Sequence, residues 1–378
     1  MQKYVFLLWR EPDLSFSEIK SLFWDAYRIS DFAVIEADRD KIDKYKESLW
    51  WTIKIGLILE ECMKKNDILS YITEHVDTRT QEDKKLRIGL DSFVPSLTAL
   101  VFKLKEKLKA RGRSIRVVQH ENWRIKTATT LHEKLIENGI ELMIFPDKNG
   151  FTIAETIWVQ NIENYSERDM NRDRSMTVGM MPPKIAQIMI NLASKWSRSV
   201  ALWDPFCWLG TTLIEASHSG FTELYGSDIE PSMVEKSQKN MEKQPLFQEN
   251  INLQTFALDA KKIDTFNLVN PTIIVTEGML GTNFTAHTLT QSHAYQERKK
   301  LTELYTDFLD SAYNNKNIDR IAFCLPFWNI NKEVLYMPEV SSMNKKWSID
   351  PLSLNGKRYL THMRPGQCVW REIIVLKK

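Results

Sequence analysis

Acidic residues follow three strand-like runs in the second half of the chain. Asp204, Asp228 and Asp259 each stand where such an apolar run ends. In a doubly wound sheet the strand ends meet at one edge, where ligands bind. A carboxylate after the second strand can accept hydrogen bonds from both ribose hydroxyls of a nucleoside cofactor, and one after the third can meet an adenine amino group. Taken singly, each is also explained as a solvated or helix-capping carboxylate, but the three in order favour a nucleoside site.

The first of these carboxylates opens the turn D-P-F-C-W-L-G, which joins a strand to a helix. A glycine in such a turn lets the backbone approach a cofactor and lets the helix N-terminus face it. Gly210 meets this need at the end of the turn. Trp208, however, puts the largest side chain at a position that calls for the smallest.

A regular alternation of strands and helices positions these residues, and it begins near residue 180. It predicts an α/β domain, 180–378, built on a Rossmann-like doubly wound sheet. A helix with proline in its first turn opens the domain, and two strands around R-P-G-Q close it as a C-terminal antiparallel hairpin. The parallel strands are expected at Val200–Trp203, Glu223–Ser227, Leu253–Leu258, Ile273–Thr276 and Ile321–Leu325.

The first part of the chain, 1–160, has a less regular pattern and is predicted to be a separate α+β module. Its first helix is expected to have Ser15 as N-cap and Glu18 as the capping-box partner. A later helix is expected to close with Gly139 as its C-cap. The polar stretch 161–179 is the predicted linker between the two domains.

Composition indicates an ordinary soluble protein. Apolar residues make up 43% of the 378 residues, charged residues make up 26%, and the net charge is +2. There is no apolar run long enough for a transmembrane helix, and the apolar start is too short for a signal peptide. The 4 cysteines are scattered and show no C-x-x-C spacing, and the 7 histidines show no H-x-x-x-H spacing. We therefore expect reduced thiols, a cytoplasmic location and no metal site.

Several segments resemble class I S-adenosylmethionine-dependent methyltransferases, above all D-P-F-C-W-L-G-T-T-L-I-E-A followed by G-S-D-I. The resemblance is greatest to the tRNA guanine-N2 methyltransferases that carry an N-terminal THUMP module, and to the related rRNA methyltransferase K/L-type domain. It extends over most of the chain, through L-K-A-R-G-R-S-I-R-V-V, E-N-Y-S-E-R-D, V-G-M-M-P-P-K-I-A-Q-I-M-I-N-L-A and R-P-G-Q. It implies a THUMP-like RNA-binding module, S-adenosyl-L-methionine as cofactor, and RNA, in particular tRNA, as partner.

The resemblance also implies which residues contact the cofactor. Four of them are the acidic residues and the glycine already singled out, and we add two further residues of the same turn. The expected cofactor-binding residues are Asp204, Phe206, Trp208, Gly210, Asp228 and Asp259.

After the fourth strand the family carries D-P-P-Y or N-P-P-Y, whereas this chain has T-E-G-M-L-G. In amino-group methyltransferases an acidic or amide side chain and a backbone carbonyl accept hydrogen bonds from the target amino group, while an aromatic ring stacks on the flipped base. We therefore expect Glu277, Gly278 and Met279 to be the catalytic residues, with Glu277 as the acceptor and Met279 able to pack on a base. A pocket that has lost activity is the alternative.

Tryptophans stand at several other positions where the family has glycine, namely Trp9, Trp50, Trp51 and Trp370. The chain has 12 tryptophans and 13 glycines, and this is about half of the glycines of an average protein. Some bacteria read the codon UGA as glycine, while a common alternative code reads it as tryptophan. Our hypothesis is that several of these tryptophans, Trp208 first, are glycines in the native protein. A tryptophan-rich core would explain the number but not the positions.

A basic run supports RNA binding. Between residues 103 and 116 the chain has seven Lys or Arg residues and one Glu. Such a run is often only a solvated face, but with the resemblance it predicts contacts to phosphates. The expected RNA-binding residues are Lys105, Lys109, Arg111, Arg113 and Arg116.

Three functions fit these observations. The leading one is an S-adenosylmethionine-dependent RNA methyltransferase that modifies an exocyclic amino group, guanine N2 of tRNA. The second is a DNA amino-methyltransferase, because the catalytic half alone would suit either nucleic acid. The third is a catalytically inactive RNA-binding protein.

Overall fold

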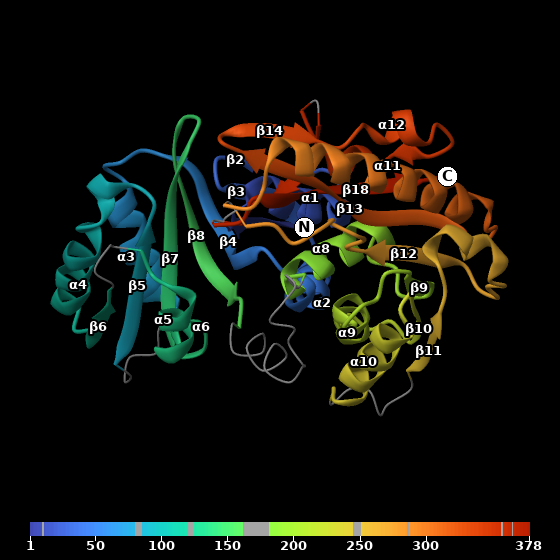
Figure 1. The fold of residues 1–378 in the computed structure, drawn as a ribbon. Helices are drawn as coiled ribbons and strands as arrows, with labels where there is room; N and C mark the ends of the chain where they lie inside the picture. Colours follow the sequence, from blue (N-terminus) through green and yellow to red (C-terminus); the bar gives the residue numbers. More distant parts are fainter. Residues whose placement is uncertain are drawn as a thin grey trace. The chain divides into compact units, whose positions relative to one another are not determined.

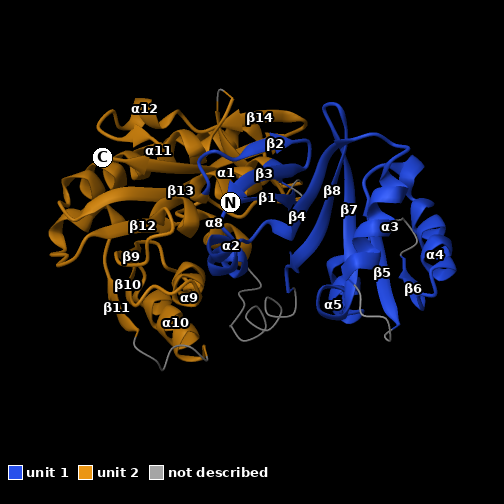
Figure 2. Ribbon diagram, turned by 180° about the vertical axis from the view of Figure 1, so that it is seen from behind, with its two compact units in different colours: residues 1–12, 23–165 blue, residues 13–22, 166–378 orange. Residues whose placement is uncertain are grey.

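The computed structural model describes residues 1–9, 11–79, 85–119, 124–161, 181–244, 251–285, 287–356, 358–364 and 366–378 (Figure 1). The chain divides into two compact units (Figure 2). The first comprises 1–12 and 23–165, and the second comprises 13–22 and 166–378. The predicted linker, 161–179, lies outside the described residues except for residue 161. The predicted domain limits therefore stay predictions.

The first unit is built on an eight-stranded mixed sheet with the order β2-β3-β1-β4-β8-β7-β5-β6. Neighbours pair antiparallel from β2 to β7, and β5 runs parallel to both β6 and β7. The strands are β1 (Gln2–Leu8), β2 (Tyr27–Ile29), β3 (Phe32–Ala37), β4 (Thr52–Met63), β5 (Leu86–Ser92), β6 (Ile115–Val118), β7 (Gly139–Asp147) and β8 (Gly150–Val159). The helices are α2 (Arg39–Tyr45), α3 (Ile68–Arg79), α4 (Leu100–Ala110), α5 (Thr127–His132) and α6 (Leu135–Asn138), with 3-10 turns η1 (Lys46–Ser48) and η2 (Pro95–Leu97).

A buried ionic cluster crosses the sheet of the first unit. Lys54 Nζ lies 2.8 Å from Asp91 Oδ2 and 2.6 Å from Glu141 Oε1. It also donates to the carbonyl oxygen of Ile125, at 2.7 Å. All three charged side chains are almost fully inaccessible to solvent. Because a buried charge is tolerated only when it is paired and hydrogen-bonded, this cluster requires β4, β5 and β7 to keep their positions.

One expectation for this unit was wrong in detail, and another is confirmed in position, because Gly139 is the C-cap of α6. The single helix expected before Gly139 is divided into α5 and α6, because Lys134 takes a left-handed conformation with φ +50°. Gly139 follows α6, but its φ of −152° is extended rather than left-handed. Its backbone continues directly into β7 and pairs with Arg87 of β5.

The second unit holds the regular alternation of strands and helices. Its helices are α1 (Pro12–Leu22, from its second residue on), α8 (Pro183–Ser194), α9 (Thr211–His218), α10 (Pro231–Glu242), α11 (Gln291–Asn314) and α12 (Val340–Met343), with 3-10 turns η4 (Ala260–Thr265) and η5 (Pro351–Ser353). Its strands are β9 (Ala201–Asp204), β10 (Glu223–Asp228), β11 (Asn252–Ala257), β12 (Thr272–Thr276), β13 (Ile318–Ile330), β14 (Glu333–Tyr336), β15 (Ser348–Ile349), β16 (Leu354–Asn355), β17 (Arg358–His362) and β18 (Val369–Lys377).

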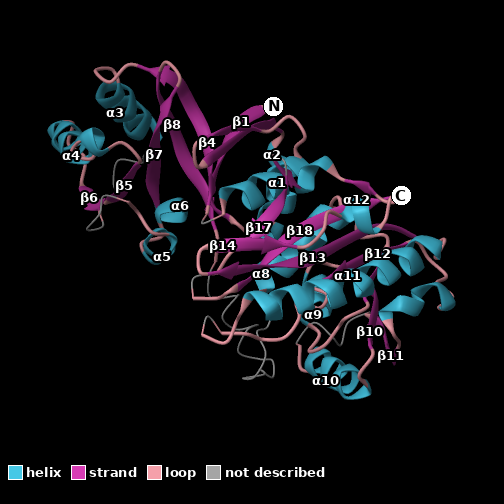
Figure 3. Cartoon of the chain, turned by 45° about the horizontal axis from the view of Figure 1, so that its top comes forward, coloured by secondary structure: helices cyan, strands magenta, loops and turns pink. Residues whose placement is uncertain are grey.

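The sheet of this unit has the order β11-β10-β9-β12-β13-β18-β17-β16 (Figure 3). The strands from β11 to β13 are parallel, while β18 pairs antiparallel with β13 and with β17. From β9 the chain proceeds first to one side, through β10 and β11, and then to the other, through β12 and β13. This reversal makes the gap between β9 and β12 the switch point of a doubly wound sheet. The Rossmann-like architecture was therefore predicted correctly.

Helices cover both faces of this sheet. Phe323 of β13 contacts Tyr305 and Phe308 of α11, with ring centroids 5.6 and 6.3 Å apart. The next residue, Cys324, has its Sγ 3.6 Å from the sulfur of Met189 in α8. Because successive side chains of a strand point to opposite faces, α8 and α11 lie on opposite sides of the sheet.

The helix α1 begins earlier than expected and belongs to this unit. Pro12 is its first residue, so Ser15 lies inside the helix and is not the N-cap. Glu18 is buried, and its Oε1 accepts a hydrogen bond of 2.7 Å from Asn191 of α8. Glu18 therefore fastens α1 to α8 instead of completing a capping box.

Candidate functional site

Asp204 lies at the end of β9, at the switch point, and its side chain is buried. The backbone N–H of Phe206 donates to its Oδ1 at 3.1 Å, and the hydroxyls of Thr212 and Thr276 also donate to the carboxylate. Burial nevertheless raises the pKa of Asp204 to about 6. The carboxylate is thus held in place by neutral donors, and no cation of the described residues forms an ion pair with it.

Gly210 is the N-cap of α9, in a conformation that other residues rarely adopt. Its φ is +81°, and a Cβ at this position would lie 2.7 Å from the Oγ of Ser237. Only glycine meets both restrictions. Gly210 therefore closes the turn and lets the N-terminus of α9 approach the strand ends.

Trp208 also has a left-handed backbone conformation, with φ +41°. Its N–H donates to Oδ2 of Asp228 at 3.2 Å, so the turn and the second strand end are joined here. A large side chain at positive φ is strained, and glycine would relieve that strain. The conformation supports the hypothesis that residue 208 is glycine in the native protein.

The other tryptophans of that hypothesis behave differently. Trp9, Trp50, Trp51 and Trp370 are absent from the described residues with positive φ. Trp50 and Trp51 are buried, and the ring of Trp370 lies 5.4 Å from that of Phe327. At these positions the backbone gives no sign of a missing glycine.

Asp228 and Asp259 accept hydrogen bonds from the backbone beside them. Oδ1 of Asp228 accepts from Glu230 N–H at 3.0 Å, and burial raises the pKa of Asp228. Oδ1 of Asp259 accepts from Lys261 N–H at 3.0 Å and caps η4. A carboxylate oxygen has two lone-pair directions, so both side chains keep capacity for a ligand.

One pocket gathers most of the predicted cofactor and catalytic residues, and its volume is about 510 Å³. Asp204, Phe206, Trp208, Asp228, Asp259, Glu277, Gly278 and Met279 all line it, together with Met181 of the segment before α8 and Leu304 of α11. Gly210 is not one of the lining residues and is the N-cap of α9. The pocket therefore lies at the carboxyl ends of β9, β10 and β12, where the sequence predicted it.

Glu277, directly after β12, forms an ion pair with Arg371 of β18. Arg371 Nε lies 2.6 Å from Glu277 Oε1, and both side chains are largely shielded from solvent. Burial raises the pKa of Glu277, while the charge of Arg371 opposes this shift. His362 lies opposite Arg371 in the β17–β18 register, and it also opposes the upward shift of the Glu277 pKa.

Tyr305 of α11 shapes the loop that follows Glu277. Its hydroxyl lies 2.9 Å from the carbonyl oxygen of Met279 and 3.1 Å from that of Cys324. Gly278 has φ +69°, and a Cβ there would collide with this hydroxyl. The Met279 side chain is half-exposed in the pocket wall. Gly278 is thus required by the close approach of Tyr305.

Four residues at the site were not predicted from the sequence, namely Thr212, Thr276, Tyr305 and Arg371. Thr212 and Thr276 lie within the quoted motifs, where hydroxyl donors close to Asp204 are the signal that points to them. Arg371 and Tyr305 carry no local signal, because strand register and helix packing place them at the site.

The predicted RNA-binding residues lie on α4, the turn after it and β6, in the first unit. Arg111 pairs with Glu74 and, at 2.8 Å, with Asp77. Arg113 also pairs with Asp77, and Arg116 with Glu133, both at 2.9 Å. Lys105 is half-buried and Lys109 is exposed. The arginines therefore hold elements of this unit together, whatever their contribution to RNA binding.

Within the described ranges there is no cluster of three or more His, Cys, Asp or Glu side chains arranged to hold a metal ion. A search of the same ranges finds no helix with the length and apolar character needed to cross a membrane.

Comparisons with known proteins agree with this architecture. Residues 171–278 match the model of a protein family described as "RMKL-like, methyltransferase domain". The resemblance to methyltransferases predicted from the sequence is thereby confirmed for this part of the chain.

Two individual proteins are similar to this chain. A tRNA (guanine(10)-N2)-dimethyltransferase of Methanocaldococcus jannaschii is 29% identical over 191 residues, which are 49% of this chain and 53% of the relative. The chain thus spans about half the length of this curated relative. The crystal structure of TrmN from Thermus thermophilus superimposes with a TM-score of 0.53 at 14% identity, covering 100% of this chain and 99% of that one. This likeness supports the fold.

Proposed function

We propose that this chain is an S-adenosylmethionine-dependent RNA methyltransferase that modifies the exocyclic amino group of guanine, N2, in tRNA. The observation that carries the proposal is the pocket at the switch point, where three carboxylates at successive strand ends meet Glu277. The match of residues 171–278 to a methyltransferase domain supports the reaction class. The relative that acts on tRNA guanine N2 supports the substrate.

The pocket suits a nucleoside cofactor. Its volume, about 510 Å³, lies in the range usual for small-molecule sites, roughly 300–1,000 Å³. Asp228 would hold the ribose hydroxyls and Asp259 the adenine amino group, while Asp204 would face the positively charged end of the cofactor. When bound, S-adenosylmethionine supplies a methyl group on a sulfonium centre that a nitrogen lone pair can attack. The side chain of Trp208 is the feature of the lining that suits this ligand least.

Glu277 is the residue that we assign to the target amino group. One of its oxygens is fixed by Arg371, which leaves the other to accept a hydrogen bond from the amino group. Such a bond orients the nitrogen lone pair and requires little acid–base chemistry. The carbonyl of Gly278 would be the second acceptor, and Met279 would pack on the face of the base.

The first unit is the part that we assign to RNA binding, as a THUMP-like module. Lys105, Lys109, Arg111, Arg113 and Arg116 would contribute phosphate contacts. Structured RNA is held by shape and backbone contacts, with a single base extruded into a catalytic pocket. The proposal places the reaction in the cytoplasm.

Methylation assays with purified protein test this function. Full-length protein is incubated with methyl-labelled S-adenosylmethionine and either unmodified tRNA or duplex DNA, and the nucleic acid is digested to nucleosides. The proposal predicts label in N2-methylguanosine from tRNA, and at least tenfold less with Glu277→Gln. Label only in DNA would establish the DNA amino-methyltransferase instead, and the RNA proposal would be wrong.

The side chain of Trp208 in the pocket wall favours a second candidate, an RNA-binding protein without catalytic activity. The protein is tested with tryptophan and with glycine at residue 208. If both forms bind tRNA and neither binds S-adenosylmethionine, this candidate is established.

A further inference from the structure

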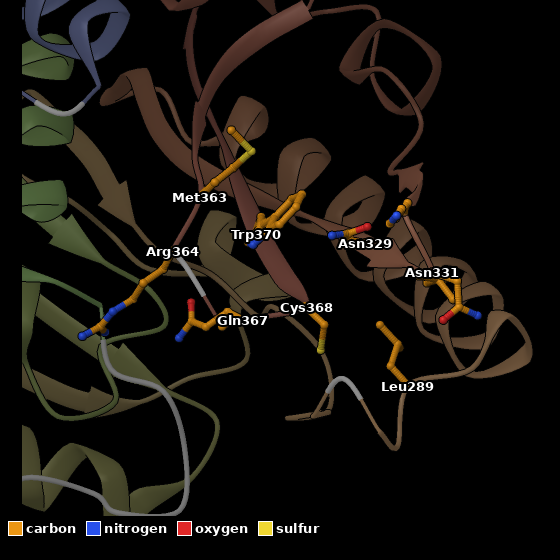
Figure 4. Close-up of a pocket in the computed structure, with 11 residues that line it drawn as sticks. Leu289, Asn329, Asn331, Met363, Arg364, Gln367, Cys368 and Trp370 are labelled. Carbon is orange, nitrogen blue, oxygen red and sulfur yellow. The ribbon is translucent and has the colours of Figure 1, made fainter.

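The second unit has another pocket, with a volume of about 620 Å³ (Figure 4). It lies at the carboxyl end of β13, between two turns that come together there. One is the β13–β14 turn, with Asn331 and Lys332, and the other is the β17–β18 turn, with Arg364 and Gln367. The pocket is therefore at the same edge of the sheet as the cofactor site, where ligands bind in folds of this kind.

The two pockets share their supporting elements. The loop after β12 lines the first pocket with 277–281 and the second with Leu289. On β18, Trp370 lines the second pocket, while the next residue, Arg371, is bonded to Glu277 in the first. The Sγ of Cys368 also lies 3.1 Å from the carbonyl oxygen of Phe284 in the shared loop. A polymeric substrate that places one of its monomers in the first pocket can therefore present the neighbouring monomer to the second pocket.

Two residues that line this pocket have buried amide oxygens for which the described part of the chain offers no hydrogen-bond partner. Among the described residues, Asn329 Oδ1 and Gln367 Oε1 are buried without a hydrogen bond. Buried polar atoms without partners are rare, and each calls for an explanation such as a ligand. Nε1 of Trp370 is likewise buried without a hydrogen bond among the described residues. Because residue 370 is one of the suggested glycine positions, the inference rests on the two amide oxygens.

Two cations stand at the rim of the pocket. Lys332 and Arg364 are exposed, and no ion pair is found for either within the described parts of the chain. Lys332 belongs to the tight turn between β13 and β14, in which Asn331 has φ +51° and Lys332 has φ +73°. Such cations, beside a pocket with polar groups inside, suit an anion such as a phosphate.

We propose that this pocket binds a guanine nucleotide of the RNA substrate, a neighbour of the one that is methylated. Guanine alone among the four bases has two adjacent N–H donor positions on one edge, N1 and N2, which match two acceptor oxygens. Lys332 and Arg364 hold the phosphate of this nucleotide. The proposal rests on the proposed function, because only a polynucleotide substrate would occupy both pockets together.

The first test uses guanosine 5′-monophosphate as the probe. It is titrated into the full chain saturated with S-adenosylhomocysteine, and binding is followed by saturation-transfer NMR, with the other three mononucleotides in parallel. The expected result is binding of the guanine nucleotide at least fivefold tighter than that of the cytosine and uracil nucleotides. Gln367→Leu weakens this binding tenfold or more, and the exposed Lys345→Gln leaves it unchanged. Equal binding by wild type and Gln367→Leu would overturn the proposal.

The second test uses tRNA and does not depend on the amide side chains. Lys332→Gln is expected to weaken tRNA binding about threefold and to reduce the salt dependence by about one phosphate contact, with unchanged affinity for S-adenosylhomocysteine. Wild-type tRNA affinity and salt dependence in Lys332→Gln would contradict the proposal. If the wild-type protein did not bind S-adenosylhomocysteine at all, the proposed function would be refuted instead. Guanosine 5′-monophosphate is then titrated into the protein alone, which tests the second pocket separately.

Discussion

Arg371 and Glu277, 94 residues apart, form a largely buried ion pair of 2.6 Å that joins the last strand to the loop after β12. The C-terminal hairpin is thus more than the edge of the sheet, because it provides the cation that fixes the acceptor proposed for catalysis. Removing that cation would leave a buried carboxylate without a partner, and such a group takes up a proton more readily.

Arg371→Met is expected to lower kcat by about ten- to a hundredfold, with little change in cofactor affinity. Without Arg371 the pKa of Glu277 rises further, so Glu277 is ionised only at higher pH, and the acidic limb of the pH–rate profile moves upward. The measurement is kcat against pH for wild type, Arg371→Met and Arg371→Lys. Arg358→Met is the matched control, because Arg358 pairs with Glu372 on the same hairpin. An unshifted profile in Arg371→Met would show that the pair is only structural.

Trp208→Gly is expected to increase the affinity for S-adenosylmethionine by roughly tenfold, because it clears the pocket wall. Loss of the strained conformation at φ +41° should also raise the free energy of unfolding by about 1 kcal/mol. Trp347→Gly serves as the contrast, because Trp347 is buried and its Nε1 donates to Leu309. That change should destabilise the fold by about 3–5 kcal/mol.

The native peptide that contains residue 208 gives an independent check. Mass spectrometry of the protein from its own source should find a glycine mass at this position. A tryptophan mass there would end the hypothesis of a reassigned codon.

Asp204 should make both stability and cofactor binding depend on pH. Its pKa of about 6 in the folded protein lies above the ordinary value of 3.8, so ionisation is disfavoured in the fold. The free energy of unfolding should therefore fall by up to about 3 kcal/mol as the pH rises from about 4 to about 6, and stay lower above that. Asp204→Asn should remove this fall and be the more stable protein at pH 8.

The same variant should bind the cofactor less well, since the positive end of the ligand loses its carboxylate. For wild type, affinity should decrease as Asp204 takes up its proton below pH 6. Thermal unfolding and calorimetric titration across this range measure both effects. Equal pH dependence in wild type and Asp204→Asn would contradict this role of Asp204.

Lys54→Met should destabilise the first unit by about 3–5 kcal/mol, because it leaves Asp91 and Glu141 buried without their shared cation. The exposed Lys64→Met is the matched control and should have almost no effect. Hydrogen exchange followed by mass spectrometry locates the change, which should appear in β4, β5 and β7. An unchanged exchange pattern there would mean that the cluster contributes little.

The sequence predicted the sheet of the second unit well, since β9, β10 and β12 are short, largely apolar strands that end in a polar or acidic residue. It also predicted which carboxylates share one edge, because parallel strands bring their ends together. Local patterns were less informative about helix ends. Ser15 looked like an N-cap, but Pro12 starts α1 three residues earlier, and Glu18 is used for contact with α8.

Arg371 and Tyr305 could not be predicted from local pattern. Arg371 reaches Glu277 only through the antiparallel register of β18 beside β13, and Tyr305 reaches Met279 only through the packing of α11. Such contacts depend on the completed tertiary structure. The charged run before β6 shows the reverse case, in which a local pattern suggested phosphate binding but its arginines form ion pairs within the unit.

Calorimetric titration tests the central claim most directly. The full chain, with either tryptophan or glycine at residue 208, is titrated with S-adenosylmethionine and with S-adenosylhomocysteine. The account predicts one binding site per chain, tighter with glycine and weakened by Asp204→Asn. The absence of binding by both forms of a folded protein would contradict it.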